Sequence, residues 1–115
     1  MTIYKSAMKG VPVVLLLDQS VDETKSIGLA IPSSFRQHKL TIKTGAGVAS
    51  GGIQPESASS PDYSGVWNPI GGGEITVPAA SSELEYNFEG IFSAIRARIN
   101  TVIGGGTVTV IYVGS

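Results

Sequence analysis

The sequence contains no cysteine and a single histidine, His38. Without cysteine, the chain has no disulfide bonds and no thiolate ligands, and thiol catalysis is excluded. One histidine and scattered carboxylates fall short of the three or four ligands that zinc takes from a protein. A Ser-His-Asp triad would depend on His38, but no serine stands in a G-x-S-x-G elbow. We therefore expect no metal, no cofactor and no enzymatic activity, and we predict that His38 is a solvated loop residue.

Charge and long apolar runs are also scarce. Charged residues make up 15% of the 115 residues, against about 25% in typical domains. The formal net charge is −1 and the basic residues form no cluster, which gives no electrostatic case for nucleic acid. The longest apolar run, residues 11–17, is far shorter than a membrane span, which needs about 20 residues. The start of the chain lacks a secretory cleavage pattern. Neither nucleic acid nor membrane is expected as a partner.

Aromatic residues are few, with one tryptophan, four tyrosines and three phenylalanines. Glu83, Glu85 and Glu89 lie close in sequence, and a pair of carboxylates is what a glycosidase uses. Such a pair needs a cleft for the sugar, usually lined with aromatic side chains, and most of the aromatic residues here are needed for a core. This shortage argues against a carboxylate-based hydrolase.

Glycine is abundant, at 15 residues, and most glycines fall in short clusters between apolar segments. Several of these segments alternate apolar and polar residues, which is typical of half-buried strands. About eight strands separated by Gly, Pro and Ser turns predict one all-β domain, an antiparallel β-sandwich. The clearest strand segments are residues 11–17, read as a buried strand, and residues 26–31, 39–44, 74–78 and 107–113.

Residues 81–102 fit two patterns. At helical spacing, Leu84, Phe88, Ile91, Ile95, Ile99 and Val102 form one apolar stripe. At a spacing of two, the same stretch gives two strands that meet at Gly90, a residue that would cost a helix interior about 1 kcal/mol. The β-branched residues after position 94 favour strands, so two strands are predicted. A short helical turn near residues 81–85 or 88–91 stays open.

Two segments are candidates for binding. Residues 1–10 precede the domain at 11–115 as an N-terminal arm, which is either frayed or ordered against a neighbouring subunit through Ile3, Tyr4 and Met8. Residues 45–65 are rich in Gly, Ala, Ser and Pro and predict a long loop with one short strand near Ile53.

Tyr63 and Trp67 lie close together in the sequence PDYSGVW, where the chain is expected to re-enter the sandwich. A tyrosine and a tryptophan beside a loop can stack on a sugar or anchor a protein interface. The alternative, which we favour, is that Trp67 plugs one end of the core. Both residues are retained as candidate partner-binding residues.

Two stretches carry a resemblance, GLAIPSSFRQHKLTIKTG and EITVPAASSELEYNFEGIFSAIRARIN. The first joins a strand ending in Ile-Pro to a strand of L-T-I type. The second runs from a strand through Pro-Ala-Ala-Ser and Phe-x-Gly-Ile to an I-R-A-R-I strand. Over residues 26–113 the chain resembles small jelly-roll structural proteins of tailed bacteriophages, including capsid decoration (cement) proteins, with a longer loop at residues 45–73.

The resemblance implies a virion protein, made in the host cytoplasm, that sits on the capsid surface and cements the shell by binding between major capsid protein subunits. Binding the assembled shell and not free subunits would stabilise it by mass action. The resemblance also implies self-association into a homodimer or homotrimer, since closed symmetry presents identical surfaces to the lattice. The alternative is a carbohydrate- or receptor-binding module of a tail or head fibre that uses Tyr63 and Trp67.

Overall fold

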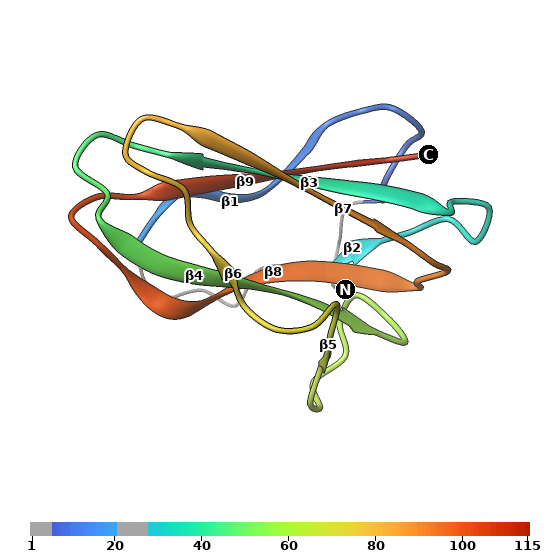
Figure 1. The fold of residues 1–115 in the computed structure, drawn as a ribbon. Helices are drawn as coiled ribbons and strands as arrows, with labels where there is room; N and C mark the ends of the chain where they lie inside the picture. Colours follow the sequence, from blue (N-terminus) through green and yellow to red (C-terminus); the bar gives the residue numbers. More distant parts are fainter. Residues whose placement is uncertain (1–5, 21–27) are drawn as a thin grey trace.

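The computed structural model describes residues 6–20 and 28–115. Within these ranges the chain forms nine strands and no helix, so the predicted all-β class is confirmed. Figure 1 shows the strands in two layers that pack face to face. The strands are β1 (Val13–Gln19), β2 (Leu29–Ala30), β3 (Gln37–Thr44), β4 (Ser50–Ala58), β5 (Asn68–Pro69), β6 (Ile75–Thr76), β7 (Glu83–Glu89), β8 (Ala94–Gly104) and β9 (Val108–Gly114).

Both sheets are antiparallel. One has the order β1-β9-β3-β7, and the other has the order β2-β8-β4-β5, with the short β6 also paired to β4. The core lies between the layers and is built from alternate residues of the long strands, such as Leu40 and Ile42 of β3 and Val108, Val110 and Tyr112 of β9. This alternation places the apolar side chains of each strand on one face, where they are removed from water.

The pairing between strands is nested. β4 pairs with β5 and β6, β3 with β7, β2 with β8, and β1 with β9. Two further ladders, β3 with β9 and β4 with β8, join these pairs into the two sheets. The arrangement is that of one long antiparallel hairpin folded over on itself.

The segment from residue 81 to residue 102 forms the strands β7 and β8, so the helical alternative is wrong. Gly90 lies in the turn between them with a φ of 140° and donates its backbone N–H to the carbonyl of Arg36. A left-handed φ of this kind is accessible to glycine at little cost. The open question of a helical turn is also answered, because neither proposed stretch contains one.

The strand expected near Ile53 is present, but the prediction that it is short and that a loop fills the rest of residues 45–65 is wrong in the middle of this range. Residues 50–58 form the nine-residue strand β4, which pairs with β8 along almost its whole length. By local propensity this segment should not be a strand, because it contains Gly51, Gly52 and Pro55. In the sheet, however, Gly52 and Pro55 make contacts that stabilise the pairing. A Cβ on Gly52 would collide with the side chain of Glu74, and the carbonyl of Pro55 accepts a hydrogen bond from the N–H of Ile70. Long-range packing has overridden the local propensity.

The first strand is less buried than expected. β1 lies at the edge of its sheet, where Leu16 is buried but Val14 and Leu17 are exposed. Its ladder with β9 has two register shifts, which rotate successive side chains out of strict alternation. Of the predicted strand at residues 26–31, the described part contains the strand Leu29–Ala30, and residues 26 and 27 lie outside the described residues.

Residues 6–10 of the predicted arm lie against the domain. Ser6 forms a parallel bridge with Ala30, and the N–H of Ala7 donates to the carbonyl of Ala30. Gly10 donates to the carbonyl of Gly114, and Ala7 is buried. These contacts tie the end of the arm to both sheets, because β2 belongs to one and β9 to the other.

Candidate functional site

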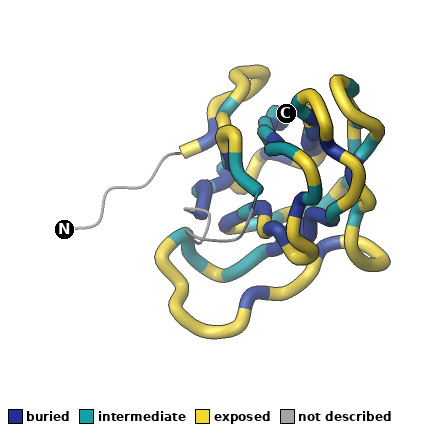
Figure 2. The backbone as a smooth tube through the Cα atoms, turned by 90° about the vertical axis from the view of Figure 1, so that its left-hand side faces the viewer, coloured by how far each residue is buried: buried dark blue, intermediate teal, exposed yellow. Residues whose placement is uncertain are grey.

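The loop at residues 59–74 crosses the outside of the sheet that contains β4 and β8. In Figures 1 and 2 it projects from the bottom of the molecule, and most of its length is exposed. The two-residue strand β5 within it pairs with Glu56 and Ser57 of β4, and this pairing fixes one side of the loop to the sheet. We call this segment the β5 loop.

Trp67 holds the β5 loop against the sheet. Its side chain is 4% exposed, and its indole N–H donates to the carbonyl of Tyr63 at 2.9 Å. The guanidinium carbon of Arg96 lies 4.4 Å from the centre of the indole ring, which is within the range of a cation–π interaction. Trp67 is therefore buried, as favoured above, but under the loop on the outer side of the sheet, stacked on a β8 side chain.

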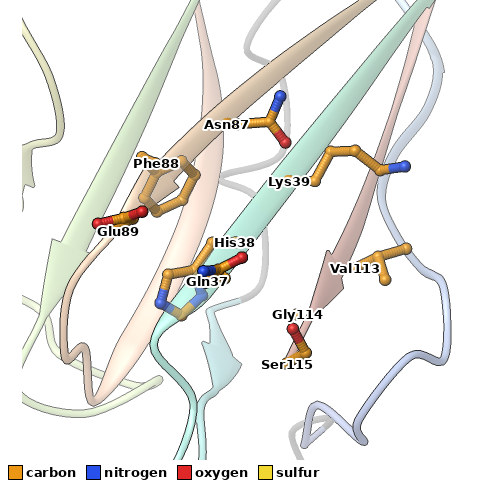
Figure 3. A pocket seen from close by; sticks show the side chains of 9 residues that line it. All are labelled: Gln37, His38, Lys39, Asn87, Phe88, Glu89, Val113, Gly114 and Ser115. Atoms are coloured by element: carbon orange, nitrogen blue, oxygen red, sulfur yellow. The ribbon is translucent and has the colours of Figure 1, made fainter.

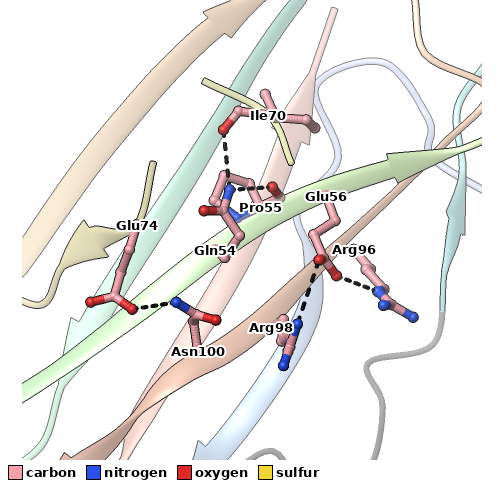
Figure 4. Close-up of polar contacts among 8 residues, drawn as sticks. All are labelled: Gln54, Pro55, Glu56, Ile70, Glu74, Arg96, Arg98 and Asn100. Atoms are coloured by element: carbon pink, nitrogen blue, oxygen red, sulfur yellow. Dashed lines mark hydrogen bonds and ion pairs between the residues drawn. The ribbon is translucent and has the colours of Figure 1, made fainter. Parts of the chain in front are cut away.

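Figure 4 shows an ion-paired group formed by Glu56, Arg96 and Arg98. The Trp67 ring lies against its Arg96 member. Glu56 of β4 accepts a hydrogen bond from Nε of Arg96 at 2.8 Å, and its second oxygen lies 3.9 Å from Nη1 of Arg98. Glu56 and Arg96 are directly opposite each other in the β4–β8 ladder. The side chain of Glu56 is 8% exposed and that of Arg96 is 17% exposed, so the carboxylate depends on these partners to be tolerated there.

Two further contacts fix the β5 loop. The side-chain amide of Gln54 donates to the carbonyl of Ile70 at 3.3 Å and to that of Pro55 at 2.8 Å (Figure 4). Gly28 lies directly against the loop, where a Cβ would collide with the carbonyl of Pro61 and come within 2.7 Å of the Trp67 ring. The loop is thus fastened to the β-sheet at its base and along its inner side.

The tip of the β5 loop presents two apolar side chains. Val66 is 88% exposed and Tyr63 is 44% exposed. The Tyr63 ring lies over Gly65, where a Cβ would meet the ring. A held loop that keeps large apolar groups in water is suited to binding, because little conformational entropy is lost when a partner covers it.

Glu74 lies at the far end of the same loop. Its carboxylate accepts hydrogen bonds from Asn100 at 2.6 Å and from Thr101 at 2.7 Å. The hydrogen bond from Thr101, which has the larger effect, and the one from Asn100 both lower the pKa of Glu74 below its usual value. The contact links the loop to β8 a second time.

The five residues predicted to bind partners have different positions. Ile3 and Tyr4 lie outside the described residues. Met8 is exposed in the turn before β1, where its carbonyl accepts the N–H of Val11. Tyr63 and Trp67 are brought together by their hydrogen bond, but only Tyr63 faces water.

His38 is buried, so the prediction of a solvated loop residue is wrong. It lies in β3, stacked on Phe88 at 5.1 Å and beside Phe92 at 5.2 Å between ring centres. Nε2 lies 2.9 Å from the carbonyl of Gly90, which only accepts, so Nε2 carries the proton. In the neutral ring with its proton on Nε2, Nδ1 accepts a hydrogen bond from the Tyr112 hydroxyl at 2.6 Å. His38 satisfies its hydrogen bonds inside an aromatic cluster, as a structural histidine does.

A shallow depression lies outside His38 and is shown in Figure 3. Its walls come from the ends of β3, β7 and β9, with Lys39, Asn87, Glu89 and Val113 among the lining residues. The three glutamates considered for hydrolysis, Glu83, Glu85 and Glu89, alternate along the exposed side of β7. They lie along one strand and do not face one another across a cleft.

In residues 6–20 and 28–115, no three His, Asp or Glu side chains gather in a way that could hold a metal ion. Among the same residues, no helix is long and apolar enough to cross a membrane.

Sequence reasoning missed three features of the site: Glu56, Val66 and the pairing of Arg96 with Trp67. The alternation of Arg96 and Arg98 is visible in the sequence, and residues two apart in a strand share a face. The position of Glu56 opposite Arg96 was not accessible, because only a short strand near Ile53 was predicted in this region and its partner strand was not.

Comparison of the chain with family models, with curated proteins and with solved structures finds no match.

Proposed function

We propose that this protein is a structural component of a bacteriophage particle, with a jelly-roll fold, that binds on the capsid exterior between subunits of the major capsid protein. The observation that carries the proposal is the nested pairing of the strands. A jelly roll is a long antiparallel hairpin wound into two four-stranded sheets, and the β1-β9-β3-β7 order opposite β2-β8-β4-β5 corresponds to that winding. Viral capsid domains are among the proteins built in this way.

The β5 loop is the surface proposed to contact the shell. It projects from one layer, carries Tyr63 and Val66 at its tip, and is held by Trp67 and Gln54. Tyrosine is among the residues enriched in interface hot spots, and a loop that is already held in place loses little conformational entropy on binding. Many copies bound at once would make a modest contact sufficient to hold the shell, because multivalent binding adds up.

The test uses particles that lack the protein and are then incubated with purified protein. We expect wild-type protein to bind such particles and to raise the temperature at which they release DNA. Val66→Asp is expected to abolish this binding while the purified variant keeps its folded circular-dichroism spectrum. Val102→Asp is the matched control, because Val102 is also exposed but lies near the opposite end of β8 from Arg96.

An electron-microscopy map of the decorated particle gives the second measurement. Density for the protein between capsid subunits is the expected result. Particles that are equally heat-resistant with and without the protein would contradict the cementing role, and density at the tail alone would contradict the capsid position.

A second candidate is a carbohydrate- or receptor-binding module of a tail or head fibre. It is favoured by one observation, the exposed ring of Tyr63, on an architecture that lectins also use. Because Trp67 is buried, a sugar would stack on Tyr63 alone. A glycan array that gives a signal with wild-type protein and none with Tyr63→Ala would support this candidate, while the absence of any sugar-dependent signal would remove it.

A further inference from the structure

Exposed apolar residues follow one another along the edge strand β1 and the segment that precedes it. Met8, Val11, Val14 and Leu17 follow one another at intervals of three residues, and each is between 42% and 65% exposed. Large apolar groups scattered singly on a surface need no explanation, but four that recur at a regular interval over ten residues of one edge call for one. We call these four residues the β1 strip.

The strip continues onto the neighbouring strand. Val14 pairs with Ile111 of β9, so both side chains lie on the outer face of the sheet, where Ile111 and Val113 are partly exposed. Beyond β9 the outer face of the sheet becomes charged, because Lys39 of β3 and Glu85 of β7 form an ion pair there. The apolar surface is therefore confined to the β1–β9 half of the sheet.

The other sheet edges are unsuited to contact with a second copy. β7 carries Glu83, Glu85 and Glu89 along its exposed side, and two such edges would repel each other. β2 is bridged by Ser6, and β5 and β6 are only two residues long. Among the described strands, β1 is the one long edge that is apolar.

The charges at the two ends of the β1 strip indicate what covers it. Lys9 lies just inside one end and Asp18 follows the other end, and both are exposed. When two copies of the strip lie antiparallel around a two-fold axis, Lys9 of each faces Asp18 of the other, and the apolar residues face one another. A surface that is complementary to itself in this way is what a two-fold interface requires.

The contact is made by side chains and not by a continued sheet. Pro12 has no N–H to donate, and the two register shifts in the β1–β9 ladder twist the edge. Both features hinder regular strand addition. The exposed Met8, Val14 and Leu17 side chains would instead pack against their counterparts.

We infer that the β1 strip is the surface through which two copies of this chain associate, antiparallel around a two-fold axis, with Lys9 of each copy opposite Asp18 of the other. The inference makes specific the homodimer or homotrimer that the resemblance implies, and to that extent it rests on the proposed function. Its test uses the purified protein alone, so it can fail while capsid binding through the β5 loop holds, and the reverse.

The experiment is sedimentation velocity of the purified full chain over a range of concentrations. We expect wild-type protein to form a dimer. Leu17→Asp is expected to weaken the dimer about a hundredfold, because it replaces one of the most exposed apolar side chains of each strip with a charge. Ile91→Asp is the matched control, since Leu17 and Ile91 are both 64% exposed and Ile91 lies outside the strip. It should leave the dimer unchanged.

A charge exchange tests the antiparallel geometry. Lys9→Glu alone and Asp18→Lys alone should each weaken association about tenfold, because each puts like charges together at both ends. The double variant Lys9→Glu, Asp18→Lys should recover the affinity of the wild type. Thermal unfolding of each variant checks that it is folded, which is needed because Asp18 has a φ of 47°.

Two results would overturn the inference. One is a wild-type chain that stays monomeric at the highest concentration used. The other is a double variant that is folded but associates no better than either single variant. If the chain is monomeric but Leu17→Asp loses binding to particles, the strip contacts the shell, and the dimer inference is wrong.

Discussion

The outer faces of the two sheets carry similar residues in different surroundings. Outside β4 and β8, Glu56 and Arg96 are covered by the β5 loop and by Trp67. Outside β3 and β7, Lys39 and Glu85 lie 3.9 Å apart, and their side chains remain 38% and 52% exposed. An ion pair open to water contributes little, whereas a covered pair becomes costly to break. The difference shows that a charged residue on a strand acquires its role from what lies over it.

The largest expected effect comes from removing the cover. Trp67→Ala deletes a buried indole that contacts Arg96, and we expect the free energy of unfolding to fall by about 3–5 kcal/mol. Urea unfolding followed by circular dichroism measures it. Val66→Ala in the same loop is the control, with an expected change within about 0.5 kcal/mol. Equal effects of the two changes would mean that Trp67 does not hold the loop.

Breaking the charge pairs tests the comparison directly. Glu56→Ala leaves Arg96 largely covered and without its carboxylate, and we expect a loss of about 3 kcal/mol of unfolding free energy. Glu85→Ala on the open face is expected to cost about 0.5 kcal/mol or less. Urea unfolding at low and high salt measures both. If the two losses were equal, the cover would have no energetic role.

The interior between the two faces gives a pH-dependent effect. Burial raises the pKa of Tyr112 to about 12 from its ordinary value of 10.0. The folded chain therefore keeps this proton where the unfolded chain loses it, so this contribution to stability is complete below pH 10 and is lost as the pH rises from 10 to about 12. Tyrosinate absorbance should show a titration step near 12 that is absent in Tyr112→Phe. If wild-type protein showed no such step, the Tyr112 hydroxyl would not be shielded from water as described.

The smallest effect is expected at Glu74, which belongs to the covered face but is itself fully exposed. Hydrogen bonds from Thr101 and Asn100 lower its pKa, so they stabilise the fold above the ordinary pKa of 4.5, and this contribution is lost as the pH falls through the lowered value. Asn100→Ala should raise the pKa of Glu74, measured by NMR titration. A pKa that moves down or not at all would show that the bond is not formed in solution.

The strands that could be predicted are those whose own sequence alternates. Apolar residues repeat at a spacing of two in both strands: Leu40 and Ile42 in β3, and Val108 and Val110 in β9. This local pattern is sufficient to identify both segments as strands. β7 and β8 were distinguishable from a helix by Gly90 and by β-branched residues. These features depend on neighbours in sequence, which is why they can be read without the structure.

The remaining features depend on residues far apart in the chain. β4 contains Gly51, Gly52 and Pro55, and it is a strand because β8 and the β5 loop pair with it. His38 is buried by aromatic residues from later strands and the turn that joins two of them, which no local pattern of residues 36–40 could reveal. The candidate site also depends on residues far apart in the chain. Tyr63 and Trp67 could be identified from the sequence, but the Glu56–Arg96 pair on which Trp67 packs could not.

A further case is the close approach of two turns. Gly47 and Gly105 both have a positive φ, and a Cβ on Gly105 would collide with the carbonyl of Gly47. The sequence places Gly47 in the predicted loop and Gly105 in a glycine cluster between apolar segments, but the reason that both must lack a side chain lies in the contact between them. Contacts of this kind appear only when the sheets are assembled.

The nested pairing has a consequence for how the chain folds. Glu56 pairs with Pro69, Lys43 with Glu83, Leu29 with Ile95 and Val13 with Tyr112, so each ladder encloses a longer stretch of chain than the one inside it. Closing a longer loop costs more entropy, but each inner ladder shortens the effective loop for the next. We expect the fold to form from β4 and β5 outward, with β1 docking last. Proteins in which most contacts join residues far apart in the sequence fold on the scale of milliseconds to seconds. During that time β1 would be the last strand to pair with its own sheet.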